Sequence, residues 1–141
     1  MNKTKLILIT SLLLITIGCS TKERPILKSP DGSEIPPYYT LFPDIPFPEP
    51  ATIDLEETKA LGSGKNWIGS LVYTTPYNAS AVYDFHMTEM PKMQWTEVAT
   101  VRTKISQMTY IKSGRAVQIL IERDGSSKAK VSITAIPNET N

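Results

Sequence analysis

The chain has 141 residues, of which 40% are hydrophobic and 21% are charged, which fits one globular domain and not a disordered chain. A net charge of +1 gives no reason to expect nucleic-acid binding. One cysteine excludes an internal disulfide framework, and one histidine excludes metal sites built on histidine pairs, so we expect no metal and no cofactor.

The amino terminus has the features of a secretory signal peptide over residues 1–18. Lys3 and Lys5 precede an apolar run from Leu6 to Ile17, and Gly18 and Cys19 follow this run. A helix of this length rises about 18 Å, which is too short for a hydrocarbon core of about 30 Å. The segment therefore predicts export and not a membrane-spanning helix.

Cys19 stands at the end of this run, in a setting that resembles the lipobox of bacterial lipoproteins. The resemblance covers residues 1–20 and departs from the pattern at Thr16, where leucine is usual. It implies that Cys19 becomes the first mature residue and carries acyl chains such as palmitate. Ser20, in place of aspartate, implies the periplasmic side of the outer membrane. The alternative is an ordinary signal peptide that happens to end near a cysteine.

Residues 19–50 are expected to form a lipid-anchored, proline-rich tether, because eight of the eleven prolines fall in this stretch. Its aromatic segment, residues 38–47, is unusual for a solvated spacer. We consider that it covers apolar surface of the folded domain, that it docks on a partner, or that it is disordered. The candidate partner-binding residues are Tyr38, Tyr39, Phe42 and Phe47.

Residues 51–141 predict a small α+β domain with the order β-β-α-β-β-β-β. Asn78 is a suitable N-cap for one helix that Pro91 would close. The expected sheet is mainly antiparallel, has five to six strands and carries the helix on one face. We expect the strands on either side of the helix to be parallel neighbours. The strand candidates are 55–61, 67–74, 95–101, 105–112, 116–122 and 129–136.

The sequence offers no catalytic constellation, so we expect the protein not to be an enzyme. His86 falls on the apolar face of the predicted helix, as a structural histidine would. Glu56 and Glu57, if on a strand, point to opposite faces and share no proton. No Gly-x-Ser-x-Gly turn occurs.

Five basic residues are expected at one end of the sheet, near the start of the helix and the entry of the tether. In a meander the turns at 102–104 and 123–128 fall at the same end. This candidate anion-facing cluster comprises Arg102, Lys104, Arg123, Lys128 and Lys130. Neighbouring acids could instead compensate it locally, namely Asp54, Glu56, Glu57 and Asp124.

The stretch from Pro43 to Pro137 resembles small periplasmic lipoprotein domains of Gram-negative bacteria. The resemblance is carried by the opening PDIP, the helix AVYDFHMTEMPKM and Trp95. The general plan is also similar to that of lipoprotein subunits of outer-membrane assembly machines. These resemblances imply an interaction or scaffold module in a cell-envelope complex, with a protein partner. The alternative is a carrier that holds an apolar ligand between Val82, Phe85, Met90 and the sheet.

Overall fold

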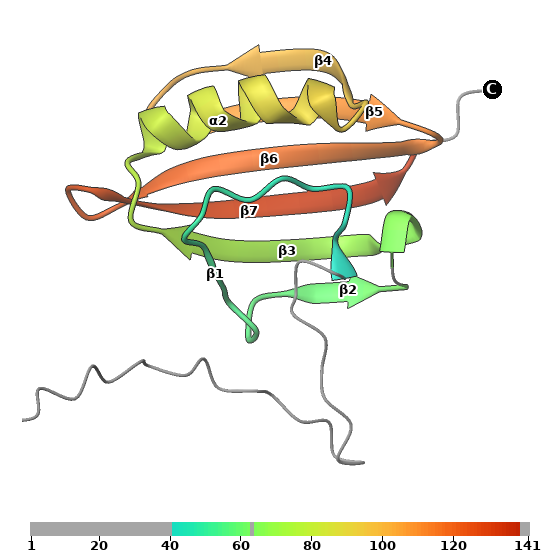
Figure 1. The fold of residues 1–141 in the computed structure, drawn as a ribbon, viewed down its shortest axis with the longest axis horizontal. Helices are drawn as coiled ribbons and strands as arrows, with labels where there is room; N and C mark the ends of the chain where they lie inside the picture. Colours follow the sequence, from blue (N-terminus) through green and yellow to red (C-terminus); the bar gives the residue numbers. More distant parts are fainter. Residues whose placement is uncertain (1–40, 63, 139–141) are drawn as a thin grey trace, which may run out of the picture.

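A computed structural model describes residues 41–62 and 64–138, which form one antiparallel sheet and one α-helix (Figure 1). The predicted α+β class, with a single helix on the sheet, is confirmed. A short 3-10 turn, η1 (Gly64–Asn66), precedes the third strand, and the helix is α2 (Ala79–Lys92). The strands are β1 (Thr52–Ile53), β2 (Lys59–Leu61), β3 (Ile68–Thr75), β4 (Thr96–Val101), β5 (Ser106–Lys112), β6 (Arg115–Asp124) and β7 (Lys128–Pro137).

The strand order in the sheet is β1-β3-β7-β6-β5-β4, and β2 pairs with the same edge of β3 as β1 does. Every pair is antiparallel, so β3 and β4 run in the same direction. In the sheet, however, β7, β6 and β5 lie between them. The expectation that they are neighbours is therefore wrong. The last strand, β7, lies between β3 and β6, where its side chains Val131 and Ile133 are buried.

Of the expected strand at 55–61, only residues 59–61 form a strand, β2, and residues 55–58 form a turn between β1 and β2. The side chain of Asp54 accepts hydrogen bonds from the backbone N–H groups of Glu56 and Glu57, each at 3.0 Å. Such a local bond competes with the strand ladder. Glu56 and Glu57 therefore lie in a turn, and the sheet has seven strands where five to six were expected.

Helix α2 begins as expected and ends later than expected. The side chain of Asn78 accepts a bond of 2.9 Å from the N–H of Ala81, as an N-cap does. Pro91 lies inside the last turn and the helix ends at Lys92. At this position the missing N–H of proline costs only one bond near the helix end.

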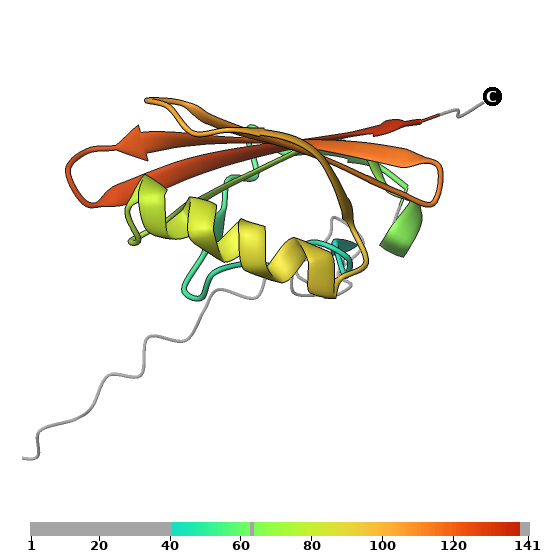
Figure 2. The ribbon, with the colours of Figure 1, turned by 90° about the horizontal axis from the view of Figure 1, so that it is seen from above.

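Helix α2 and residues 41–50, which we call the strap, lie on the same face of the sheet (Figure 2). Six strand positions make the sheet about 24 Å wide, whereas a helix with its side chains is about 10–12 Å across. The strap covers β3 and β7 beside the helix (Figure 1). The folded unit thus includes residues before the expected boundary at 51, and residues 41–47 of the aromatic segment lie on the face that carries the helix and not on the opposite, open face.

The two ends of the sheet differ in what they carry. Helix α2 starts near the β4–β5 and β6–β7 turns, because Thr75 and Arg123 both pair with Ala129. We call this the helix-start end. The β5–β6 turn, η1 and Trp95 lie at the helix-finish end. Phe42 and Asp44 of the strap also lie there, so the chain enters at the end opposite to the one expected.

Candidate functional site

The strap is built into the hydrophobic core. Phe42 and Ile45 are each 3% exposed. The ring of Phe42 meets Trp67 edge-to-face with centroids 4.7 Å apart, and Phe47 meets Tyr73 in the same way at 5.4 Å. Of the four candidate partner-binding residues, Phe42 and Phe47 therefore contact the domain itself, and Tyr38 and Tyr39 lie outside the described residues.

A buried ion pair fixes the strap to the sheet. The guanidinium of Arg115 donates to the carboxylate of Asp44, and the two side chains are 9% and 1% exposed. The indole N–H of Trp67 donates to the Asp44 carboxylate at 3.2 Å, and the indole N–H of Trp95 donates to the backbone carbonyl of Asp44 at 2.7 Å. Arg115 also donates to the Trp67 carbonyl at 2.9 Å. This network satisfies both charges, as a buried pair requires.

His86 and Tyr73 form a second buried polar pair, between the helix and β3. Their Nε2 and OH atoms are 2.7 Å apart, and neither residue has exposed surface. Burial lowers the pKa of His86 to about 3 and raises the pKa of Tyr73. The Nδ1 of His86 has no hydrogen-bond partner among the described residues. A neutral imidazole with no access to solvent cannot exchange a proton with a substrate, so this pair serves packing.

The five basic residues do lie at the helix-start end, but two of them are already paired. Arg102 contacts both carboxylate oxygens of Asp84, at 2.8 and 3.2 Å, and stacks on the ring of Tyr83 at 4.5 Å. Lys130 contacts Glu57 at 2.6 Å, and this hydrogen bond raises its pKa. Lys130 is thus compensated by Glu57, one of the four acids expected from the sequence, whereas Arg102 pairs with Asp84 of the helix, which was not among them.

The other three basic residues, Lys104, Arg123 and Lys128, make no ion pair within residues 41–62 and 64–138. Asp124 lies opposite Lys128 in the ladder, so the helix-start end has mixed sign. Cys19 lies outside the described residues.

The open face of the sheet carries an apolar row at the helix-finish end. Leu61 pairs with Ile68, and Ala116 pairs with both Ile136 and Ile111. Since Gly69 pairs with Ala135, Ile68 and Ile136 are next to each other. These side chains alternate with the buried set and so point away from α2. We call Leu61, Ile68, Ile136, Ala116 and Ile111 the apolar row.

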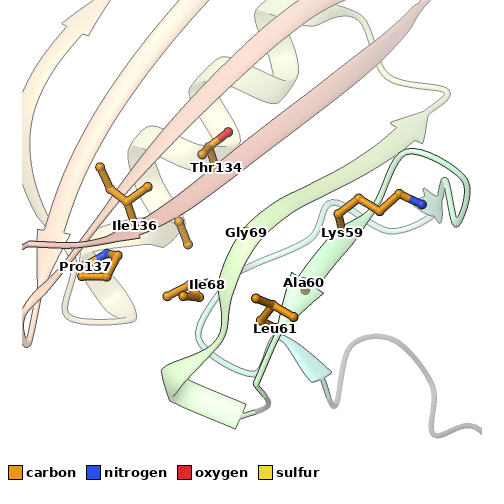
Figure 3. Close-up of a pocket in the computed structure, with 9 residues that line it drawn as sticks. Lys59, Ala60, Leu61, Ile68, Gly69, Thr134, Ile136 and Pro137 are labelled. Atoms are coloured by element: carbon orange, nitrogen blue, oxygen red, sulfur yellow. The ribbon is translucent and has the colours of Figure 1, made fainter.

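The apolar row is exposed to solvent and borders a shallow hollow. Leu61 is 72% exposed and Ile136 is 54% exposed. A shallow hollow of about 560 Å³ lies between β2, β3 and β7, and its lining includes Leu61, Ile68, Ile136 and Lys59 (Figure 3). Gly69 maintains this arrangement, because its φ is +126° and a Cβ there would lie 2.1 Å from the carbonyl oxygen of Lys59.

Sequence reasoning missed both the ion pair and the apolar row. The pairing of Asp44 with Arg115 spans 71 residues, and no local pattern indicates it. The row did leave a signal, because Ile111, Ala116 and Ile136 occupy the outward positions of otherwise alternating strands.

No protein-family model and no curated protein matches the chain. Among the described residues, no helix has the length and apolar character needed to cross a membrane. The same residues contain no group of three or more histidine, cysteine, aspartate or glutamate side chains placed to hold a metal ion.

Proposed function

We propose that the protein is a lipid-anchored, non-enzymatic interaction module of the cell envelope, held on the periplasmic side of the outer membrane by acyl chains on Cys19. The signal-like leader and the cysteine at its end support the anchor. An attachment through two or more acyl chains is effectively stable, since each buried CH₂ contributes about 0.8 kcal/mol.

The observation that carries this proposal is the continuity between the anchored chain and the core. The segment arriving from Cys19 enters the domain at Phe42 and is fixed by the pairing of Asp44 with Arg115. The strap is thereby held as part of the folded domain. His86 and Tyr73, the polar pair that could have served catalysis, are sealed in the core.

A carrier of an apolar ligand is the second candidate. Val82 and Met90 have no exposed surface and pack within the core, so side chains fill the space between helix and sheet that a carrier would need. A groove of about 330 Å³ does lie on the outer side, between the strap and α2, and Pro48, Tyr77 and Phe85 contribute to its lining. Its size is at the lower limit for small-molecule sites.

The test uses the full-length protein and its Cys19→Ala variant, expressed in a Gram-negative host. We expect the wild type in the outer-membrane fraction with the mass of an acylated chain starting at Cys19. The variant should be released or left uncleaved. A photo-crosslinking residue at Val98, which is 57% exposed on edge strand β4, should capture an envelope protein only in the anchored form.

Equal fractionation and equal mass of the two forms would contradict the anchor. The carrier would be favoured by two results together: the wild type binds an apolar probe that the groove-filling variant Ala81→Trp does not bind, and crosslinking captures no protein.

A further inference from the structure

We infer that the helix-finish end of the open face docks on an anionic phospholipid surface, so that the anchored domain lies against its own membrane. The apolar row would enter the interfacial region, and Lys59 at its border would contact a lipid phosphate. The inference rests on the proposed lipid anchor for its biological setting. The surface chemistry that carries it belongs to the folded domain alone.

The first argument is the contiguity of the exposed aliphatic side chains. Leu61, Ile68 and Ile136 are adjacent across three strands, and Ala116 and Ile111 continue the row toward β4. Single exposed apolar residues are ordinary on a protein surface, but a continuous patch marks a contact with a partner or a membrane. Flexible aliphatic side chains around a shallow hollow suit the fluid boundary between headgroups and acyl chains.

The second argument is the sign of the charges at the border. Lys59 lines the hollow and Lys65 lies in η1 at the same end, and both are exposed. Neither makes an ion pair with any residue that the structure describes. On the same face, Glu122 lies toward the helix-start end, opposite Lys130. The hollow is thus lined by one lysine, Lys59, and by no acidic residue, which complements an anionic leaflet. The turn η1, which carries Lys65, lies on the side of the sheet that holds the helix (Figure 2).

The third argument is where the chain enters the domain. The strap begins at the helix-finish end, with Phe42 against Trp67 and Asp44 against Arg115. Only 21 residues separate Cys19 from Leu41, which limits their span to at most about 80 Å. This confinement raises the effective concentration of the patch at the leaflet, so a weak contact suffices.

A second copy of the chain fits this surface less well. A two-fold interface places the same patch on both sides, so each copy would bring Lys59 and no acidic residue from the lining of its hollow. Like charges brought together in this way oppose association. A membrane surface supplies the opposite charge over the whole patch.

The experiment uses the mature chain without acyl chains, residues 19–141 with Cys19→Ser. Because the natural chain has a single cysteine, Ile136→Cys allows one environment-sensitive fluorophore to be placed in the apolar row. Glu122→Cys gives a matched label on the same face at the helix-start end. Vesicles of phosphatidylethanolamine and phosphatidylglycerol are compared with vesicles of phosphatidylcholine at low and high salt.

We expect a blue shift and a rise in emission for the label at 136 with the anionic vesicles only, reduced at high salt, and little change for the label at 122. Lys59→Ser should weaken partitioning by about fivefold. Lys65→Ser, in η1 on the helix side of the sheet, is the matched control and should weaken it less. Both side chains are exposed, so circular dichroism should show that the variants keep the fold.

Three results would overturn the inference. The first is no response at 136, or an equal response at 136 and 122. The second is a blue shift at 136 that appears without vesicles and grows with protein concentration, which indicates self-association. The third is photo-crosslinking at 136 in cells that yields a protein adduct and no lipid adduct. Because the vesicle assay omits the acyl chains, its failure is distinguishable from failure of the anchor, which Cys19→Ala fractionation reports.

Discussion

The Asp44–Arg115 pair is the contact on which the attachment of the strap depends most. Both charges are removed from water, and Trp67 completes their hydrogen bonding, since its indole donates to Asp44 and its backbone carbonyl accepts from Arg115. Because Arg115 would remain charged without its partner, loss of the carboxylate leaves an uncompensated charge in the core.

Asp44→Asn should therefore destabilise the domain by about 3–5 kcal/mol in a urea unfolding experiment. Lys92→Ser is the matched control, because it breaks the Lys92–Glu89 contact of 2.6 Å on the exposed side of the helix. Its effect should be about 0.5 kcal/mol or less. Similar losses in the two variants would show that the strap does not depend on the buried pair.

His86 makes the stability of the domain depend on pH. Burial lowers its pKa in the folded state to about 3, whereas the unfolded chain has the ordinary value of 6.5. Between these values the unfolded state binds more protons, so stability is full above the unfolded pKa and falls as the pH decreases. The loss from this residue between about pH 7 and about pH 5 is about 2 kcal/mol.

His86→Gln, which keeps a hydrogen-bonding group toward Tyr73 but does not titrate, should flatten the dependence over this interval. Urea unfolding of both proteins at the two pH values measures the difference. The same decrease in both proteins would show that other groups cause the pH dependence.

Among the elements, the helix and the central strands were the most predictable from sequence, and the strap was the least. Asn78 and the spacing of Val82 and His86 identify the helix locally, because capping and amphipathicity are properties of neighbouring residues. The position of the strap depends instead on partners far along the chain, such as Trp67 and Arg115. No periodicity in a proline-rich segment reports such partners.

The strap should behave as part of the fold in truncation experiments. Removing residues 41–50 exposes the sites of Phe42 and Ile45, each of which contributes about 1.5–3 kcal/mol by burial, in addition to the buried ion pair. Because domains are stable by only about 5–15 kcal/mol, a chain starting at residue 51 should lose cooperative unfolding.

Thermal unfolding followed by circular dichroism and by the fluorescence of Trp67 and Trp95 measures this loss. A chain starting at residue 41 should unfold like the mature chain and serves as the control. An unchanged midpoint for the chain starting at residue 51 would contradict a structural role of the strap.

For the whole molecule, local patterns indicated the α+β class and the directions of the strands but not their order. The alternation in β6 and β7 identifies half-buried antiparallel strands. It does not determine which strand pairs with β3, because alternation shows which side chains face the core and not which strand lies alongside. The burial of Val131 and Ile133 favours a central position for β7 in the sheet. The two strands that lie beside β7 are determined only by assembly of the whole sheet.

The central position of the last strand also determines when the domain can fold. Strand β3 pairs along its length with β7, and Asp44 of the strap forms an ion pair with Arg115 at the start of β6. The amino-terminal half therefore lacks these two partners until the final residues are available. Contacts this distant in sequence form slowly and late. A chain that must cross a membrane as an extended thread, as proposed for this protein, is thereby kept from folding prematurely. Export would be complete, or nearly so, before the domain closes.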